Sequence, residues 1–188
     1  SDWNNPANWS CGFVPYPGTG VLIPDVAVEP VIASGVTGEA GNIVVAAGSS
    51  ITLSGGTMRI YGTVSGPGFF SASAGTVVFS GSAPQVVPNG IFSSDRVMNL
   101  TVSNASGVTL AGPVNVTGVV LVQNGELASG GNLTLVSEAS GTALIDGSGS
   151  GNVTGNVTMQ RYLPSRFGYR YFSSPFAAST VSEFADDM

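Results

Sequence analysis

The sequence predicts an all-β protein whose chain winds into a parallel β-helix, or β-solenoid. Three observations support this fold: short strand-like segments, glycine and asparagine between them, and a repeat of about 20–24 residues. The segments are clearest in residues 99–136, NLTVSNASGVTLAGPVNVTGVVLVQNGELASGGNLTLV, where apolar and small polar residues alternate. Alternation with a period of two is typical of strands with one buried face.

The repeat is visible in the spacing of equivalent apolar residues. Leu100 and Leu121 are 21 residues apart, and Leu110 and Leu133 are 23 apart. A repeat of this length is within the range of stacked solenoids. Residues 21–160 would form six or seven coils, a rod about 30 Å long at the spacing of paired strands. Crossovers between parallel strands are right-handed by default, so we expect a right-handed parallel β-helix.

One such coil cannot be stable alone, because the conformational entropy lost in ordering it exceeds what its few buried side chains gain. Hydrogen bonds and contacts to the coils on either side must supply the difference. The alternative fold is a β-sandwich, since Asn89-Gly90 and Asn124-Gly125 are sequences that favour hairpin turns.

The two ends of the chain differ from the middle. Residues 1–20 contain both tryptophans, Trp3 and Trp9, and three of the 11 prolines, and we expect an aromatic N-terminal cap over the first coil. Residues 161–188 contain three of the five arginines and three of the five tyrosines. We interpret them as the start of a following domain or a C-terminal cap, in a chain that looks truncated.

Residues 80–97 are less regular, and we expect them to leave the coil as a loop with Phe92 returning to the core. The neighbouring Phe69, Phe70 and Phe79 are also expected to fill the core.

The composition excludes several functional classes. The net charge is −6 and the chain has no Lys, which argues against nucleic acid and against anionic membrane surfaces. No apolar run is long enough to cross a bilayer, so we expect no membrane insertion.

Without His, the chain has neither a His-activated nucleophile nor an ordinary zinc site. We therefore expect no enzyme activity, no catalytic residues, no metal and no cofactor. Glu126 and Asp146, 20 residues apart, are expected to be solvated acids rather than a catalytic pair.

Seven Asn-x-Ser/Thr sequences begin at Asn8, Asn99, Asn104, Asn115, Asn132, Asn152 and Asn156. They would be glycan acceptors in a eukaryotic secreted protein. The structural interpretation is favoured here, with Asn at tight corners and stacked on successive coils as a hydrogen-bonded ladder.

Several motifs resemble those of large secreted surface proteins of Bacteroidetes. Residues 3–24 are similar to the opening of these proteins, with NWS followed by GFVP and VLIP. GTVVFSGSAPQVV with MNLTVSNASGVTL resembles their recurrent block, and GNVTMQRY with YRYFSSP resembles their closing segment. The resemblance implies a β-helix-like region within an exported, adhesin-like protein, commonly delivered by type IX secretion. It implies no enzymatic activity.

We therefore expect a non-catalytic structural or adhesive segment, a rigid solenoid stalk of an extracellular or cell-surface protein. Its expected partners are surface glycans or other cell-surface proteins. The alternatives are a carbohydrate-binding module and a fragment of a polysaccharide-degrading enzyme. For the carbohydrate-binding module, the candidate sugar-stacking residues are Trp3, Trp9, Tyr162, Tyr169 and Tyr171.

Overall fold

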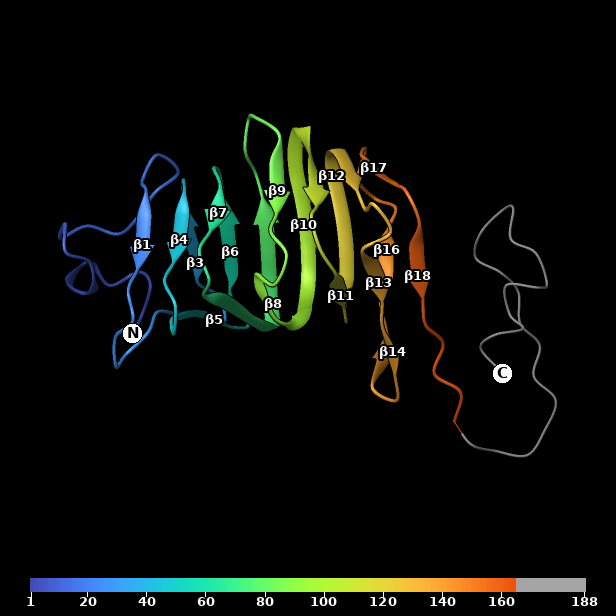
Figure 1. The fold of residues 1–188 in the computed structure, drawn as a ribbon, viewed down its shortest axis with the longest axis horizontal. Coiled ribbons are helices and arrows are strands. Elements are labelled where there is room, and N and C mark those ends of the chain that lie inside the picture. Colours follow the sequence, from blue (N-terminus) through green and yellow to red (C-terminus); the bar gives the residue numbers. More distant parts are fainter. Residues whose placement is uncertain (165–188) are drawn as a thin grey trace.

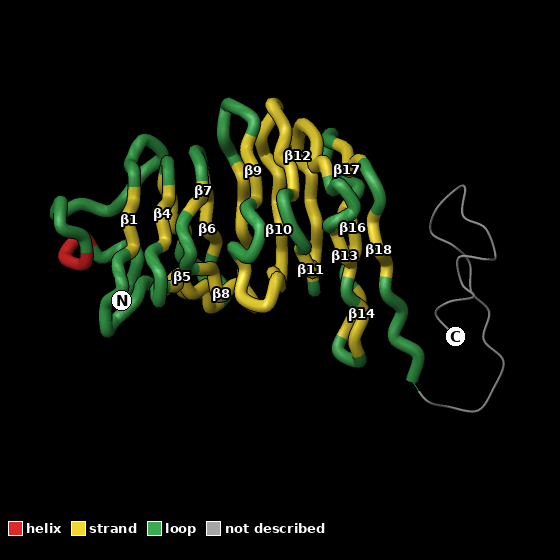
Figure 2. The backbone as a smooth tube through the Cα atoms, viewed as in Figure 1, coloured by secondary structure: helices red, strands yellow, loops and turns green. Residues whose placement is uncertain are grey.

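The computed structural model describes residues 1–164, and these form a parallel β-solenoid of about seven turns. The strands follow one another along the long axis, from β1 near the N-terminus to β18 at the opposite end (Figure 1). The only helix in the described part is the short 3₁₀ helix η1, Pro6–Asn8 (Figure 2). The predicted solenoid and its coil number are confirmed.

Each coil contributes strands to three faces. The first face contains β1 Val21–Ile23, β4 Ile43–Val45, β7 Val64–Ser65, β9 Gln85–Val87, the last parts of β10 Phe92–Leu110 and β12 Val119–Ala128, and β17 Asn152–Thr154. The second contains β2 Val31–Ala33, β5 Ser50–Ser54, the start of β8 Phe69–Phe79, the start of β10, β11 Val114–Val116, β13 Leu133–Leu135 and β18 Val157–Met159. The third contains β3 Thr37–Ala40, β6 Thr57–Ile60, the end of β8, the middle of β10, the start of β12 and β16 Leu144–Asp146.

Three strands are longer than the sequence pattern suggested. β8, β10 and β12 have 11, 19 and 10 residues. Each keeps pairing with its neighbours while bending round a corner, so one strand serves more than one face. β10 shifts register against β12 between Asn104 and Val108 where it turns. It also takes up residues 92–97, and β9, which pairs with the last part of β10, lies within the predicted loop as well. The prediction that residues 80–97 leave the coil was therefore wrong in both of these places.

The parallel register excludes the β-sandwich. Leu100 pairs with Val120, which pairs with Ile145, so equivalent residues repeat along the rod. The one antiparallel ladder in residues 1–164 is the small hairpin of β14 Ser137–Glu138 and β15 Gly141–Thr142. Neither Asn-Gly pair closes a hairpin, and Gly125 lies inside β12, in parallel register with Asn104. The alternative fold, the β-sandwich, was therefore wrong.

The core is a column of aliphatic side chains between the three faces. Residues that share a register, such as Val97, Val116 and Leu135, are buried one above another. Phe70, Phe79 and Phe92 are buried as predicted. Phe69 is not, because it precedes Phe70 in the same strand and therefore points outward, with 38% of its surface exposed.

The N-terminal segment lies against the first coil. Trp3 N–H donates to the Val31 carbonyl at 3.1 Å, and the Val31 N–H donates to the Ser1 carbonyl at 2.6 Å. The Trp3 side chain has no exposed surface and belongs to the core. Its indole packs beside Gly38, where an added Cβ would lie 3.1 Å from the ring.

Candidate functional site

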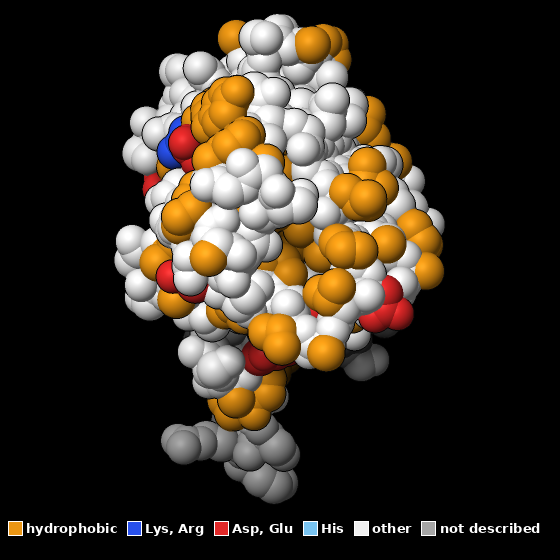
Figure 3. Space-filling view, turned by 90° about the vertical axis from the view of Figure 1, so that its left-hand side faces the viewer, with side chains coloured by type: hydrophobic (Ala, Val, Ile, Leu, Met, Phe, Trp, Pro, Cys, Tyr) orange, Lys and Arg blue, Asp and Glu red, His pale blue; other side chains and the backbone are white. Residues whose placement is uncertain are grey.

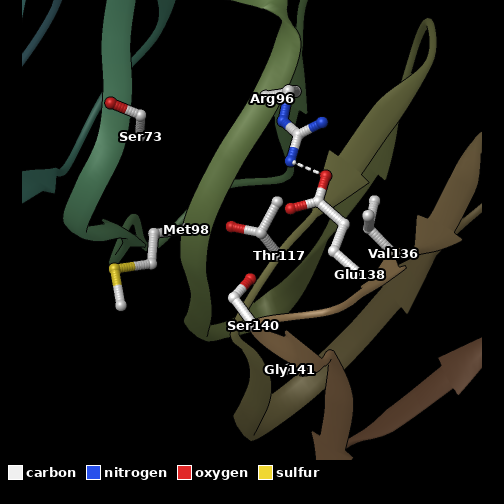
Figure 4. Close-up of a pocket in the computed structure, with 8 residues that line it drawn as sticks. All are labelled: Ser73, Arg96, Met98, Thr117, Val136, Glu138, Ser140 and Gly141. Carbon is white, nitrogen blue, oxygen red and sulfur yellow. Dashed lines mark hydrogen bonds and ion pairs between the residues drawn. The ribbon is translucent and has the colours of Figure 1, made fainter. Parts of the chain in front are cut away.

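A cleft on the side of the rod is the candidate site (Figure 4). Its central feature is an ion pair between Arg96 on β10 and Glu138 on β14, with 2.6 Å between Nη2 and Oε1. The two side chains are 42% and 48% exposed, so both remain accessible to a ligand.

The cleft has a volume of about 380 Å³. Its lining combines the ion pair with three hydroxyl groups and the exposed thioether of Met98. The hydroxyls belong to Ser73, Thr117 and Ser140. Figure 4 shows Thr117 and Ser140 beside the ion pair. Such a set of charged and neutral donors and acceptors suits a small polyhydroxylated ligand.

Local backbone geometry places both charged residues. Ser94 and Asp95, with φ of 54° and 56°, are the only non-glycine residues of the described chain in the left-handed region. This rare pair of conformations turns β10 immediately before Arg96. On the other side, the β14–β15 hairpin holds Glu138, with 2.6 Å between the Ser137 and Thr142 hydroxyl oxygens.

The predicted aromatic residues lie in different surroundings. The fully buried indole of Trp3 offers no face to a sugar ring. Trp9 is half-buried, meets Trp3 edge-on at 4.8 Å, and donates its indole N–H to the Trp3 carbonyl at 2.8 Å. Tyr162 is 49% exposed, and its backbone N–H donates to Ser137 Oγ at 2.9 Å, next to Glu138. Tyr169 and Tyr171 lie outside the described residues.

The two acids considered as a catalytic pair occupy different faces of the rod. Glu126 pairs in register with Asn152, whereas Asp146 pairs with Leu121. A hydrogen bond from the backbone N–H of Ser148 lowers the pKa of the Asp146 carboxyl. In residues 1–164 no three His, Cys, Asp or Glu residues come together as metal ligands. No helix in this part is long and apolar enough to span a membrane.

Asparagine side chains connect coils, but not by stacking on one another. Asn99 donates to the Gly75 carbonyl on one side at 3.1 Å, and its Oδ1 accepts from Val119 N–H on the other at 3.0 Å. Asn132 similarly donates to the Leu110 carbonyl at 3.1 Å. The predicted Asn–Asn ladder was wrong, because these amides bond backbone groups of the neighbouring coils and not one another.

Comparison with protein families, curated proteins and solved structures gave no significant match.

Sequence reasoning missed Arg96 and Glu138 as a site. The available signal was their separation of 42 residues, twice the 21-residue spacing seen between equivalent positions. Residues two coils apart can meet only if the intervening coil leaves room at that corner, and the side-chain pattern alone does not reveal this.

Proposed function

We propose that this chain is a rigid structural segment, a stalk without catalytic activity, in a secreted or cell-surface protein. The observation that carries the proposal is the continuous stacking of coils from β2 to β18, reinforced by side chains that bridge one coil to the next. Stacked coils bury one continuous core, and each coil adds a fixed length to the rod. The resemblance to exported adhesin-like proteins of Bacteroidetes supports the same assignment and an extracellular location.

Deletion of one whole coil tests this function. Val114 and Leu133 share a register, so removing residues 114–132 joins equivalent points of successive coils. Dyes placed on Cys11 and on an introduced Gln160→Cys should then come about 4.8 Å closer by energy transfer, with the fold retained. Removing residues 114–122 breaks the register and should prevent folding. A whole-coil deletion that fails to fold, or release of fragments from polysaccharides by the wild-type chain, would count against the proposal.

A second candidate function, carbohydrate binding, is favoured by the cleft at Arg96 and Glu138. Its hydroxyl-rich lining and the nearby exposed Tyr162 combine polar recognition with a ring available for stacking on a sugar. A glycan array should show saturable binding that is lost in Arg96→Met and weakened in Tyr162→Ala. Arg59→Met, which removes an arginine bonded to Ser80 on another face, is the matched control. Equal binding by Arg96→Met and the wild type would rule out this cleft as a sugar site.

A further inference from the structure

The N-terminal end of the rod has an apolar groove between the segment of residues 8–15 and β1. Its volume is about 600 Å³, and Phe13, Leu22, Val26 and Val28 line it. These four side chains are 46%, 62%, 46% and 66% exposed. In Figure 3, hydrophobic side chains surround a hollow on this end of the molecule. A concentration of large apolar side chains around a hollow marks an interaction surface more often than a chance feature.

One edge of the groove is an unpaired strand edge. Val21 N–H donates to the Asn42 carbonyl, and the Ile23 carbonyl accepts from Ala46 N–H, so both residues face β4. The alternation of a parallel ladder directs the N–H and C=O of Leu22 to the opposite side. Within residues 1–164 no strand pairs with that side of β1. A free edge beside apolar side chains can accept an extended peptide as an added strand.

Charge limits what can bind there. Residues 1–58 contain Asp2, Asp25, Glu29 and Glu39 and no Lys or Arg. Asp2 lines the groove, while Asp25 and Glu29 are sequence neighbours of its lining residues Val26 and Val28. Two such ends would repel one another, so the complementary occupant is apolar and cationic.

The chain itself contains a segment with this chemistry. Residues 161–172, RYLPSRFGYRYF, hold three of the five arginines and no acid. Within it, Phe167, Tyr169 and Tyr171 alternate with Gly168 and Arg170, the period-two pattern of a strand with one apolar face.

The segment cannot reach the groove of its own chain. The described chain ends at Pro164, and Figure 1 shows this end of the described chain at the end of the rod opposite the N-terminus. Five residues extend at most about 18 Å, whereas seven coils span about 29 Å. Tyr169 is therefore restricted to the groove of another molecule.

We propose that residues 166–171 of one copy add a strand to β1 in the groove of a second copy, joining rods head to tail. Leu22 supplies the backbone partners, the apolar lining receives the aromatic rings, and the acidic end attracts Arg166 and Arg170. This contact is heterologous, so it leaves a free groove and a free segment after each addition and builds open filaments. The inference goes beyond the stalk function, because a rod that stays monomeric would still be a stalk.

Sedimentation velocity of the 188-residue chain tests the contact, over a wide range of concentration and in low and high salt. We expect association that grows with concentration and weakens with salt. Leu22→Arg should weaken it by at least about tenfold, as should Arg166→Glu combined with Arg170→Glu. Val86→Arg, on a residue of β9 that is 51% exposed but outside the groove, should have no effect. A mixture of the Leu22→Arg chain with the double-glutamate chain should associate again, because the unchanged groove of the double-glutamate chain can bind the unchanged segment of the Leu22→Arg chain.

A second readout uses Cys11, which is the only cysteine, is exposed and lines the groove. An environment-sensitive dye on Cys11 should respond to a synthetic peptide of residues 161–172, and less so in Leu22→Arg. Purely monomeric wild-type chain with no dye response would overturn the proposal. Association that survives Leu22→Arg, or that Val86→Arg abolishes equally, would overturn it too.

Discussion

The side-chain amide of Asn104 donates a hydrogen bond of 2.9 Å to Gln85 Oε1 inside the solenoid. Both residues are almost wholly buried, at 0% and 5% exposure. Gln85 also donates to the Gly62 and Ile60 carbonyls and accepts from Gly81 N–H. No backbone ladder joins β7 to β9 in the described chain, and these two amides fill that break on the first face with hydrogen bonds.

Asn104→Ala should therefore destabilise the fold by about 1–3 kcal/mol, the usual cost of leaving buried polar partners unsatisfied. Three partners lose their bonds: the Ala83 carbonyl, Gln85 Oε1 and Ser106 N–H. Asn152→Ala is the control, because this asparagine also begins an Asn-x-Ser/Thr sequence but is exposed. Urea unfolding midpoints compare the two variants. Equal midpoints would contradict the structural role of Asn104.

The same network shows how far the sequence could predict the structure. The spacing of about 21 residues was sufficient to predict stacked coils, because equivalent inward positions must be apolar in every coil. Gln85 lies in a stretch rich in Pro, Ser and Gly, where a glutamine is ordinarily exposed. Its buried role depends on the missing ladder between two strands, which is a property of the assembled coil and not of the local pattern.

Individual registers were also beyond sequence reasoning. Adjacent coils are offset by 19 residues between Val97 and Val116 but by 24 between Leu135 and Met159. With offsets this variable, a fixed period could predict neither which asparagine lies above which glycine nor the meeting of Arg96 with Glu138.

Trp3 and Trp9 should differ strongly in their contribution to stability. Trp3→Ala removes a fully buried indole, and we expect a loss of about 3–5 kcal/mol. Trp9→Ala loses a half-buried ring and one hydrogen bond to the Trp3 carbonyl, and about 1 kcal/mol is expected for the hydrogen bond. Trp3→Phe should cost less than Trp3→Ala, because the phenyl ring still fills part of the space that the indole occupies. Neither variant loses a hydrogen bond of the indole N–H, which has no partner. Thermal unfolding of the three variants ranks their losses of stability. A larger loss for Trp9→Ala than for Trp3→Ala would disprove the assignment of Trp3 to the core.

Stability should fall in alkaline solution through Tyr61. Partial burial, helped by the hydrogen bond of 2.8 Å that its hydroxyl donates to Glu39, raises the pKa of Tyr61 above 10.0. The unfolded chain therefore releases this proton first, so the stabilisation is complete below pH 10 and is lost as pH rises through the folded-state pKa. Tyr61→Phe should flatten the decline in unfolding free energy above pH 10. The chain has no lysine, so few other groups titrate in this range. If the unfolding free energy of Tyr61→Phe falls with pH as steeply as that of the wild type, this linkage is excluded.

The ion pair of the cleft should contribute little to the fold. Arg96 and Glu138 are both about half exposed, and such pairs are generally worth about 0–1 kcal/mol. Glu138→Gln should therefore leave the unfolding midpoint nearly unchanged, with a small difference that disappears in high salt. A loss as large as that of Asn104→Ala would mean that the pair holds the β14–β15 hairpin in place. A near-neutral result would leave both charges available for a ligand.

Glycines on successive coils should be as important as the asparagines they face. A Cβ added at Gly118 would lie 2.5 Å from Asn99 Oδ1, the atom that accepts from Val119 N–H. Gly118→Ala must therefore displace the bridging amide, and we expect a loss of about 1–3 kcal/mol from overpacking. Gly141→Ala is the matched control, because nothing lies within 4 Å of a Cβ added there. In the double variant Gly118→Ala with Asn99→Ala, the cost of the alanine at 118 should be smaller, since the clashing oxygen is gone. If the double variant loses as much unfolding free energy in urea as the two single variants together, Gly118 and Asn99 are not coupled.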